Sequence, residues 1–428
     1  MACLLLPLLF ATWMKIPAAE PQAIVTSAAY PSIQAALDAN PNRVIHVPAG
    51  DHRISAKIRI RGENSGLTGP GRIIQTNPEQ PILEIERTRG TLVRDLTLTR
   101  PEGSMDTNSE AILAMQSEDL VLENVRIINN RTRSASISLR DCKHCRISRC
   151  NIRNYSRITV DDRTANTELY GYAFICIDGS GIVVRSSTAT LIEGNTIIEE
   201  NLRPTAENQK KHNLGKIIRK LPQKPAAVNQ KMWDSEYTDN WHQGSAIAVT
   251  SPESTNLTRI LGNHIQNAAQ GIDLHCDRAI VSQNIIDNAF IGMKAMHGSR
   301  NILIHGNQFS RNDLWAIGLM PGAAAHAKNT DGGSIVANNI ISDFGHGDAH
   351  WIWGPDRSPL KFDNGQQADD PPLTDVIIQA NLIYNPDKPR YKYAVIIAGG
   401  PTAPKGLQFS NNHFPAGSQG VANRELKP

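Results

Sequence analysis

The strongest constraint on the fold of this chain is a short unit, Asn-x-(Ile or Phe), that recurs along the sequence. The intervals between successive units are shortest in the middle of the chain, where they lie in the low twenties of residues. Short apolar stretches and turns alternate between the units, and no long helical pattern interrupts them. This periodicity predicts a solenoid of stacked β-coils. The units begin at Asn195, Asn263, Asn284, Asn307, Asn339, Asn381 and Asn412.

The recurring Asn has a structural explanation. In a parallel solenoid each coil lies about 4.8 Å above the preceding one. An Asn amide can donate a hydrogen bond to one neighbour and accept one from the next, and Asn tolerates left-handed turns. Earlier coils carry Leu96, Val125 and Cys150 at the equivalent place. We therefore expect the Asn residues to stabilise the stack, and we assign them no catalytic role.

The composition fits a single domain of this kind. The chain has 428 residues, and a prior of about 150 residues per domain would favour two or three domains. Only 5% of the residues are aromatic, which suits a narrow core of small aliphatic side chains. The net charge of +3 lacks the polyelectrolyte signature of nucleic-acid binding, and past the N-terminus no apolar run is long enough to span a membrane. We expect a monomer without nucleic-acid or membrane partners.

The N-terminal residues predict export. Leu4 to Trp13 is almost wholly apolar, and Pro17-Ala18-Ala19 supplies small residues for cleavage. We expect residues 1–19 to be a signal peptide, the protein to be secreted or periplasmic, and residues 20–428 to form the β-helix domain. Departures from the regular period predict an insertion at about 203–243 and long loops at about 321–334 and 344–375.

The start of the domain supports a family resemblance. Ser32 can cap a short helix that continues to Ala39, and Val44-Ile45-His46-Val47-Pro48-Ala49-Gly50 follows as a strand and turn. Together with the Asn-marked coils, these segments resemble the right-handed parallel β-helix, pectate-lyase-like superfamily. The resemblance implies an all-β single domain with an N-terminal capping helix and loop insertions. It leaves the activity open, because the superfamily includes polysaccharide lyases, glycoside hydrolases, epimerases and phage tailspikes.

The strands that precede four Asn units align with one another, at residues 245–250, 270–275, 291–296 and 315–320. Alternation directs every second side chain outward. We expect Cys176 and Asp178, on an earlier strand, to extend the two outward columns. The first column is Ala248, Asp273, Lys294 and Gly318, and the second is Thr250, His275, Met296 and Met320.

Titratable side chains are concentrated on this face. Asp273, His275 and Lys294 would lie on neighbouring coils, flanked by the small residues Ala248 and Gly318. The turns that follow add further charged or titratable groups. A surface ion pair between Asp273 and Lys294 is the simpler alternative, but the whole cluster is typical of a substrate groove. The turn residues are Asp277, Arg278, His297 and Arg300.

The aromatic residues favour the same region. Every Trp after Trp13 lies between positions 233 and 353, and an indole ring packs well on the C–H face of a sugar. Anchoring of loops is the alternative role. Basic residues far outnumber acidic ones in the insertion at 203–243, so this segment would attract an anionic glycan. The candidate substrate-binding residues are Trp233, Tyr237, Trp241, His242, Trp315, Trp351 and Trp353.

These groups suit β-elimination on a uronate polymer. The reaction needs a base, a cation near the carboxylate and a proton donor. We expect Lys294 to be the base, Arg300 or Arg278 to neutralise the carboxylate, and His275 or His297 to donate a proton. The neighbouring Asp273 would favour protonated Lys294 unless Asp273 binds Ca²⁺, with Asp277 as a second ligand. Without calcium, His275 or His297 is the better base.

Three other functions remain open. A glycoside hydrolase would use paired carboxylates. The fragments Asn329-Thr330-Asp331, Gly345-His346-Gly347 and Asp369-Asp370 are similar to polygalacturonase motifs, but their order differs and no Arg-Ile-Lys follows. We interpret them as chance matches. A C5-epimerase would share most of the lyase groups, and a non-catalytic glycan-binding β-helix would leave the Asp273, His275 and Lys294 cluster unexplained.

Overall fold

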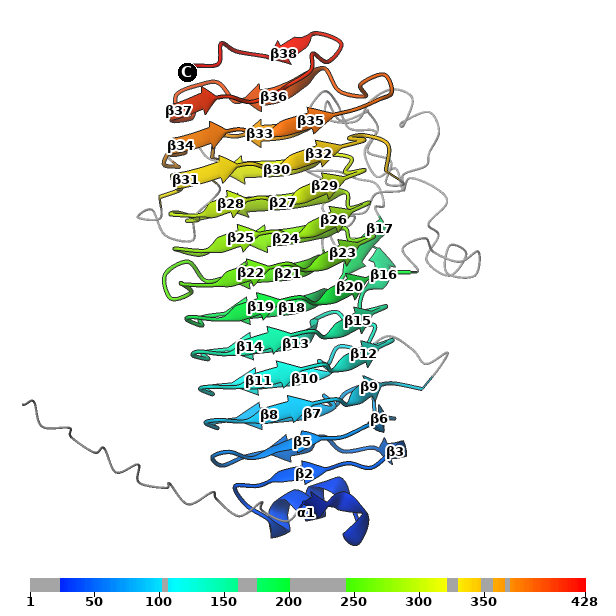
Figure 1. Cartoon of the computed structure of the whole chain (residues 1–428). Helices are drawn as coiled ribbons and strands as arrows, with labels where there is room; N and C mark the ends of the chain where they lie inside the picture. Colours follow the sequence, from blue (N-terminus) through cyan, green and yellow to red (C-terminus); the bar gives the residue numbers. More distant parts are fainter. Residues whose placement is uncertain are drawn as a thin grey trace, which may run out of the picture.

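The chain folds into a tall solenoid, with α1 (Ile33–Ala39) at one end and the C-terminal strands at the other (Figure 1). The computed structural model describes residues 24–101, 107–160, 175–200, 244–321, 330–347, 357–365 and 370–428. The predicted signal peptide and the insertion at 203–243 lie outside these residues. Over the described residues the strands form three long parallel sheets, here named A, B and C. The predicted parallel β-helix is therefore confirmed.

Each coil contributes one strand to each sheet in the order C, A, B. Within the described residues, sheet A has 13 strands, sheet B 11 and sheet C 12. Sheet A contains β1 (Val25–Thr26), β2 (Val44–His46), β5 (Gly66–Thr68), β8 (Leu92–Arg94), β11 (Val121–Glu123), β14 (Arg146–Ser148), β19 (Leu191–Glu193), β22 (Arg259–Leu261), β25 (Ile280–Ser282), β28 (Leu303–His305), β31 (Gly332–Ala337), β34 (Thr374–Gln379) and β37 (Lys405–Ser410).

Sheets B and C complete the coils. Sheet B contains β3 (Gly50–Ile54), β6 (Gly71–Gln75), β9 (Thr97–Thr99), β12 (Arg126–Ile128), β15 (Asn151–Arg153), β20 (Thr196–Ile198), β23 (His264–Gln266), β26 (Ile285–Asp287), β29 (Gln308–Ser310), β32 (Ile340–Ser342) and β35 (Leu382–Tyr384). Sheet C contains β4 (Ile58–Ile60), β7 (Leu83–Glu86), β10 (Ile112–Met115), β13 (Ala135–Arg140), β18 (Ser180–Arg185), β21 (Ser245–Thr250), β24 (Gln270–Leu274), β27 (Ile291–Met296), β30 (Trp315–Met320), β33 (Ser358–Phe362), β36 (Tyr393–Ile397) and β38 (Gly420–Ala422).

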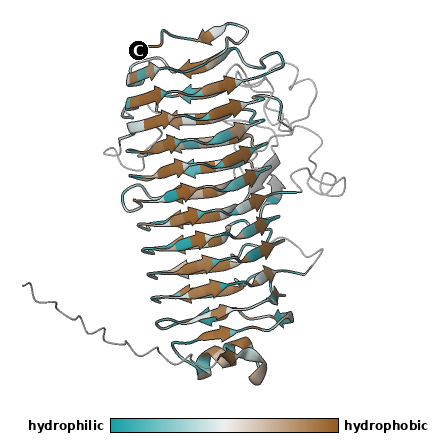
Figure 2. Ribbon diagram, viewed as in Figure 1, coloured by the Kyte–Doolittle hydropathy of each residue, from teal (hydrophilic) through white to brown (hydrophobic). Residues whose placement is uncertain are grey.

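A single apolar core runs inside the three sheets. It consists mainly of Ile, Leu and Val side chains stacked on their counterparts in the next coil, and it extends from Ile33 in α1 to Phe409 in β37. The strands are accordingly rich in apolar residues along the whole solenoid (Figure 2). No helix among the described residues is long and apolar enough to cross a membrane.

The Asn residues form the predicted ladder between sheets A and B. The Oδ1 of Asn284 accepts from the backbone N–H and the Nδ2 of Asn263, each at 2.9 Å, and Asn284 donates in turn to Oδ1 of Asn307. The same bonds continue at both ends, from Asn195 up to Asn412. One detail of the prediction is wrong, because the left-handed residue is not the ladder Asn but the residue before it, such as Gln283 or Asn338.

The N-terminal cap confirms the predicted helix. Ser32 caps α1 by accepting from the Ala35 N–H at 3.0 Å, and Ile33, Ala36 and Leu37 cover the core. The Gln34 side chain pairs with both backbone groups of Arg59 on β4, at 2.7 and 3.2 Å, and so occupies the outer edge of sheet C. A free sheet edge invites pairing with other chains, which this contact opposes.

Three local predictions need correction. β33 lies inside the segment 344–375, and β31 begins inside the segment 321–334, where we expected long loops. β17 (Ile175–Asp178) pairs antiparallel with β16 (Arg157–Val160) outside the solenoid, so Cys176 and Asp178 do not extend the outward columns. Val183 and Arg185 of β18 pair with Ala248 and Thr250 instead. The apolar strands β17 and β18 follow each other closely in the sequence, and alternation alone does not show which of them belongs to sheet C.

Candidate functional site

The outward column of sheet C has the predicted register. Ala248 pairs with Asp273, Asp273 with Lys294, and Lys294 with Gly318. The inward neighbours Ile272, Leu274 and Met293 are completely buried. The site therefore lies on the outer face of β21, β24, β27 and β30, about halfway along the solenoid (Figure 1).

Asp273 connects two of the predicted groups. Its Oδ2 lies 3.3 Å from Nζ of Lys294, and its Oδ1 lies 3.0 Å from Nε2 of His275. The three side chains are only 15–18% exposed. Burial opposes ionisation of Asp273, but the charge of Lys294 and the hydrogen bond from His275 outweigh it and lower its pKa to about 2. The carboxylate is thus ionised across the physiological pH range.

His275 and His297 also come together. Their rings stack, with centroids 4.9 Å apart and planes 17° from parallel. His297 follows β27 and has a left-handed backbone, with φ of 51°. The turn after β27, which contains His297, differs from the corresponding turn after β24. It directs the His297 imidazole over that of His275.

The remaining predicted groups gather around Asp277, on the turn between sheets C and A. Its Oδ2 lies 3.0 Å from Arg278 and 3.6 Å from Arg300, and its Oδ1 accepts from Asn301 at 2.8 Å. Asp277 itself is buried. Arg300 and Arg278 therefore flank the His pair rather than the Lys294 column, and both have a carboxylate partner.

Trp315 is the described member of the predicted aromatic set. Its ring lies over Gly318, where an added Cβ would come within 3.2 Å of Trp315 Cε3. The Trp315 side chain also packs against a small apolar cluster around Phe290 and Ile291. The ring therefore covers the sheet position next to Lys294. The other candidates, Trp233, Tyr237, Trp241, His242, Trp351 and Trp353, lie outside the described residues.

The structure adds Lys361 to this face, a residue that the sequence prediction missed. Lys361 of β33 pairs with Gly318, so the outward column continues as Lys294, Gly318 and Lys361. Nζ of Lys361 lies 3.6 Å from Asp363. We had assigned this segment to a loop. Aligning Leu360-Lys361-Phe362 with Ile317-Gly318-Leu319 would have revealed the strand.

Asp331, which we had interpreted as part of a chance motif, is buried beside the site. Its two carboxylate oxygens accept from the backbone N–H groups of Gly298 and Ser299, both at 2.9 Å. Burial raises its pKa to about 7, against the opposing effect of these N–H groups and of His275 and Arg300. A carboxyl group with this pKa can change its charge near neutrality.

The predicted calcium ligands fit that ion poorly. Asp273 binds Lys294 and His275, and Asp277 binds two arginines, so cations already neutralise both carboxylates. Calcium needs six to eight oxygen ligands. Among the described residues, one group of three His, Cys or carboxylate side chains is close enough to share an ion, and it is Glu118, Asp119 and His144 on a distant turn. We therefore derive no step through calcium.

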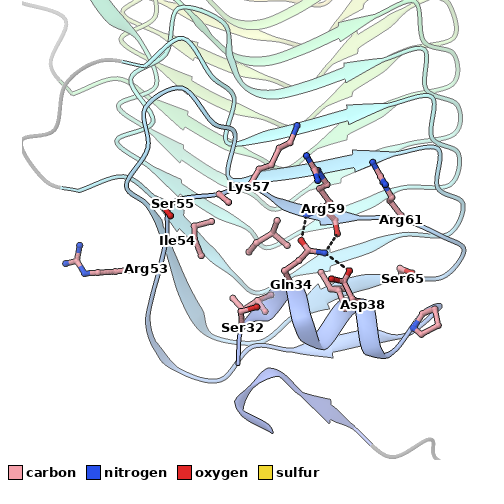
Figure 3. A pocket seen from close by; sticks show the side chains of 15 residues that line it. Ser32, Gln34, Asp38, Arg53, Ile54, Ser55, Lys57, Arg59, Arg61 and Ser65 are labelled. Carbon is pink, nitrogen blue, oxygen red and sulfur yellow. Dashed lines mark hydrogen bonds between the residues drawn. The ribbon is translucent and has the colours of Figure 1, made fainter. Parts of the chain in front are cut away.

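A separate hollow lies at the N-terminal end. A cavity of about 720 Å³ is lined by residues of α1 and of β4 and the segment before it. Lys57, Arg59 and Arg61 project beside this cavity (Figure 3). Lys57 and Arg59 pair with Glu84, and Arg61 pairs with Glu86. β4 is six strands from β24 in sheet C, a separation of about 29 Å. This cavity is therefore separate from the Asp273 site.

Solved structures with the same fold are enzymes that act on polysaccharides. The catalytic domain of a GH87 α-1,3-glucanase in complex with nigerose has a TM-score of 0.59 and 12% identity over 95% of this chain and 69% of that chain. The A-module of a mannuronan C-5 epimerase from Azotobacter vinelandii gives 0.51 and 12%, over 91% and 100%. A PL6 alginate lyase in complex with a trisaccharide gives 0.53 and 10%, over 91% and 84%.

At 10–12% identity, the similarity to these solved structures establishes the fold alone. The chain has the right-handed parallel β-helix fold that the sequence predicted. A family model described as the periplasmic copper-binding protein NosD matches residues 100–217, which is less than half of the chain. No curated protein matches the sequence.

Proposed function

We propose that this protein is a carbohydrate-active enzyme, and specifically a polysaccharide lyase that cleaves an anionic, uronate-containing glycan by β-elimination. The observation that carries the proposal is the double contact of Asp273 with Lys294 and His275 on the outer face of sheet C. The folds shared with an alginate lyase, a mannuronan epimerase and a glucanase support a polysaccharide substrate.

Lys294 acts as the cation of the reaction. Its ammonium group is held by the ionised Asp273 and faces outward from sheet C. A uronate carboxylate bound to this ammonium loses much of its negative charge. The proton on the adjacent C5 then becomes more acidic, because the enolate formed by its removal is stabilised. This role differs from our sequence prediction, in which Lys294 was the base.

His275 is the better base. Its Nε2 donates to Asp273 at 3.0 Å, which fixes the ring and leaves Nδ1 as the acceptor. A neutral imidazole held in this way can remove the C5 proton near neutral pH. The electron pair of the C5–H bond forms the C4=C5 double bond, and the C4–O bond to the next sugar breaks.

His297 is placed to complete the elimination. Its ring lies 4.9 Å from that of His275, so both imidazoles face the same bound sugar. The leaving oxygen needs a proton, and a protonated His297 can supply it. Arg300 and Arg278, held by Asp277 on the adjoining turn, add positive charge beside the His pair.

The rest of the outward column suits a polymer. Lys361 lies two coils from Lys294, a separation of about 10 Å, and the Trp315 ring covers the coil between them. The two ammonium groups would therefore bind carboxylates on different sugar units, with a sugar ring packed on the indole between them.

A hydrolase is less well supported. Inverting and retaining hydrolases need two carboxylates within about 10 Å of each other. From β21 to β36 the described outward columns of sheet C carry carboxylates at Asp273 and Asp363. These lie three coils apart, or about 14 Å.

A C5-epimerase is the second candidate. It would use the same proton removal and return a proton to the other face of the sugar, for which two imidazoles are suited.

Export remains part of the proposal: the family model that matches residues 100–217 is described as periplasmic, in agreement with the predicted signal peptide.

The test is a panel of uronate polymers, including alginate and polygalacturonate. A lyase gives oligosaccharides that absorb ultraviolet light through the new C4=C5 double bond. Reducing ends without this absorbance would identify a hydrolase, and altered sugar composition without cleavage would identify an epimerase. On a cleaved polymer, His275→Gln should abolish the reaction, whereas Asp287→Asn, which breaks an ion pair with Arg311 on sheet B, should not.

A further inference from the structure

Asp331 occupies an unusual position in a second ladder of the solenoid. Where sheet C turns toward sheet A, each coil has one buried side chain stacked on its counterpart in the next coil. We call this column the hydroxyl ladder. Its register is defined by backbone hydrogen bonds, because the N–H of the residue after each ladder member donates to the carbonyl of the ladder member one coil below. Its members are Thr88, Ser117, Cys142, Ser187, Thr255, Cys276, Ser299 and Asp331, all of them buried.

The members of the hydroxyl ladder other than Asp331 have neutral side chains. Ser187 Oγ accepts from the Cys142 N–H at 3.0 Å, and Thr255 Oγ1 accepts from the Ser187 N–H at 3.4 Å. A hydroxyl group is sufficient for this bond. Asp331 makes the equivalent bond to the Ser299 N–H at 2.9 Å, but with a carboxylate. An ionisable group in a buried structural column needs a reason, because its charge is costly to bury.

The second oxygen of Asp331 supplies that reason. It accepts from the Gly298 N–H at 2.9 Å, a bond that a single hydroxyl cannot add to the first. Gly298 directly follows His297, and both have positive φ, at 95° and 51°. Ser299 Oγ lies 2.8 Å from the carbonyl oxygen of Leu274 and 3.0 Å from that of Met296, so its one O–H holds the other side of the turn through either acceptor. The turn that presents His297 to His275 is thus fastened by Asp331 from within.

We propose that Asp331 is a positioning residue whose two carboxyl oxygens fasten the turn Met296–Ser299 and so set His297 against His275, and that removing one of these acceptor oxygens loosens the turn. The consequence for catalysis rests on the proposed function, whereas the fastening itself does not.

The surroundings make the fastening dependent on pH. Burial raises the pKa of Asp331 to about 7, so the carboxylate gains and loses its proton near neutrality. The titratable His275 and the charged Arg300 act on it from the coils below, and His297 lies in the turn itself. On the other side Thr374 donates its N–H to the Asp331 carbonyl, and the preceding Leu373 is buried and apolar. Because this raised pKa favours the protonated carboxyl in the closed turn, opening that exposes Asp331 to water should become easier as the pH rises through 7.

Amide NMR of the whole protein tests the fastening without any substrate. The N–H signals of Gly298 and Ser299 should shift with pH with a midpoint near 7 in the wild type. In Asp331→Asn the shift should disappear, and hydrogen exchange at Gly298 should become about tenfold faster or more. Asp331→Ser installs the usual ladder residue, and should protect Ser299 but not Gly298. Thr255→Ser, lower in the hydroxyl ladder, is the matched control.

Kinetics on a cleaved polymer test the positioning. Asp331→Asn should lower kcat by about ten- to a hundredfold with little change in KM, and should flatten the pH dependence of kcat near pH 7. A persistent amide shift in Asp331→Asn, or unchanged exchange at Gly298, would overturn the fastening. Lost protection with wild-type kcat would overturn the positioning role. A wild type inactive on every polymer would instead count against the proposed function, while the NMR result would still decide the fastening.

Discussion

Asp273 and Lys294 face each other across neighbouring strands of sheet C, with 3.3 Å between Oδ2 and Nζ. Each is the other's partner in register, and His275 shares the same carboxylate. The low pKa of Asp273 keeps it ionised, so it acts as a fixed negative charge rather than as an acid or base. Under the proposed function it orients two groups with different tasks: a cation for the substrate and an imidazole for its proton.

Asp273→Asn should therefore reduce activity far more than stability. The amide cannot neutralise Lys294 and cannot select the His275 tautomer, so we expect kcat to fall by about 100- to 10,000-fold. Because the pKa of Asp273 is lowered to about 2, loss of its charge should also cost about 2 kcal/mol of stability at neutral pH, so rates are compared well below the unfolding transition. Initial rates and denaturation curves measure the two effects. Comparable losses in Asp273→Asn and in the sheet B control Asp287→Asn would contradict this assignment.

Lys361→Met should separate binding from chemistry. Lys361 lies two coils from Lys294, beyond the Trp315 ring, so it contacts a carboxylate that does not react. We expect KM for the polymer to rise about tenfold with kcat nearly unchanged, since one charge-assisted contact is lost in ground and transition states alike. Lys405→Met, on the exposed strand β37, is the control. A loss confined to kcat would instead place Lys361 at the reacting sugar.

Chelation should leave the enzyme active. The candidate calcium ligands Asp273 and Asp277 are bound to cationic side chains, and Lys294 supplies the positive charge that a metal ion would otherwise provide. We expect full initial rates after dialysis against EDTA. Activity that disappears with EDTA and returns with Ca²⁺ would show that these ion pairs rearrange around an ion.

Asn284→Ala should destabilise the solenoid. Its side chain receives two bonds from Asn263 and donates to Asn307 and to the Ile260 carbonyl. Removing the amide leaves buried groups above and below without partners, at about 1–3 kcal/mol each. We expect a loss of about 3 kcal/mol in the free energy of unfolding, measured by denaturation. Asn151→Ala, on the partly exposed face of β15, should cost about 0.5 kcal/mol or less.

The sequence predicted those features that repeat. Asn284 and Asn307 recur at a nearly constant interval, and alternation around Ile272 and Met293 is enough to place Asp273 and Lys294 on one outward column. The register of β24 and β27 followed without any knowledge of the turns. Repetition carried this information, because each coil repeats the environment of the one before.

Features that occur once were not predicted. Lys361 lies on a strand that follows a long departure from the period, and Asp331 lies in the 32-residue interval between Asn307 and Asn339, which is also longer than the regular period. The position of Asp331 depends on backbone N–H groups of the turn after His297, whose conformation alternation does not specify. The exchange of roles between Lys294 and His275 likewise depends on which atoms Asp273 contacts, and spacing alone does not determine this.

The raised pKa of Asp331 has a consequence for stability that is independent of any substrate. An unfolded Asp has a pKa near 3.9, whereas burial raises that of Asp331 to about 7 in the fold. Between these values the folded state binds the proton more tightly than the unfolded state. The contribution of Asp331 to stability is therefore greatest below about pH 4 and declines as the pH rises to about 7, by at most about 4 kcal/mol.

Asp331→Asn removes this dependence, since an amide does not titrate. The variant loses one hydrogen-bond acceptor at every pH, but above pH 7 it also avoids burying a charge. The free energy of unfolding of the variant, relative to wild type, should thus increase from pH 4 to pH 8. Denaturation midpoints across this range measure the difference, with Asp287→Asn as the control for a partly exposed, ion-paired carboxylate. A constant difference between Asp331→Asn and wild type would mean that Asp331 is already ionised in the folded protein at acid pH.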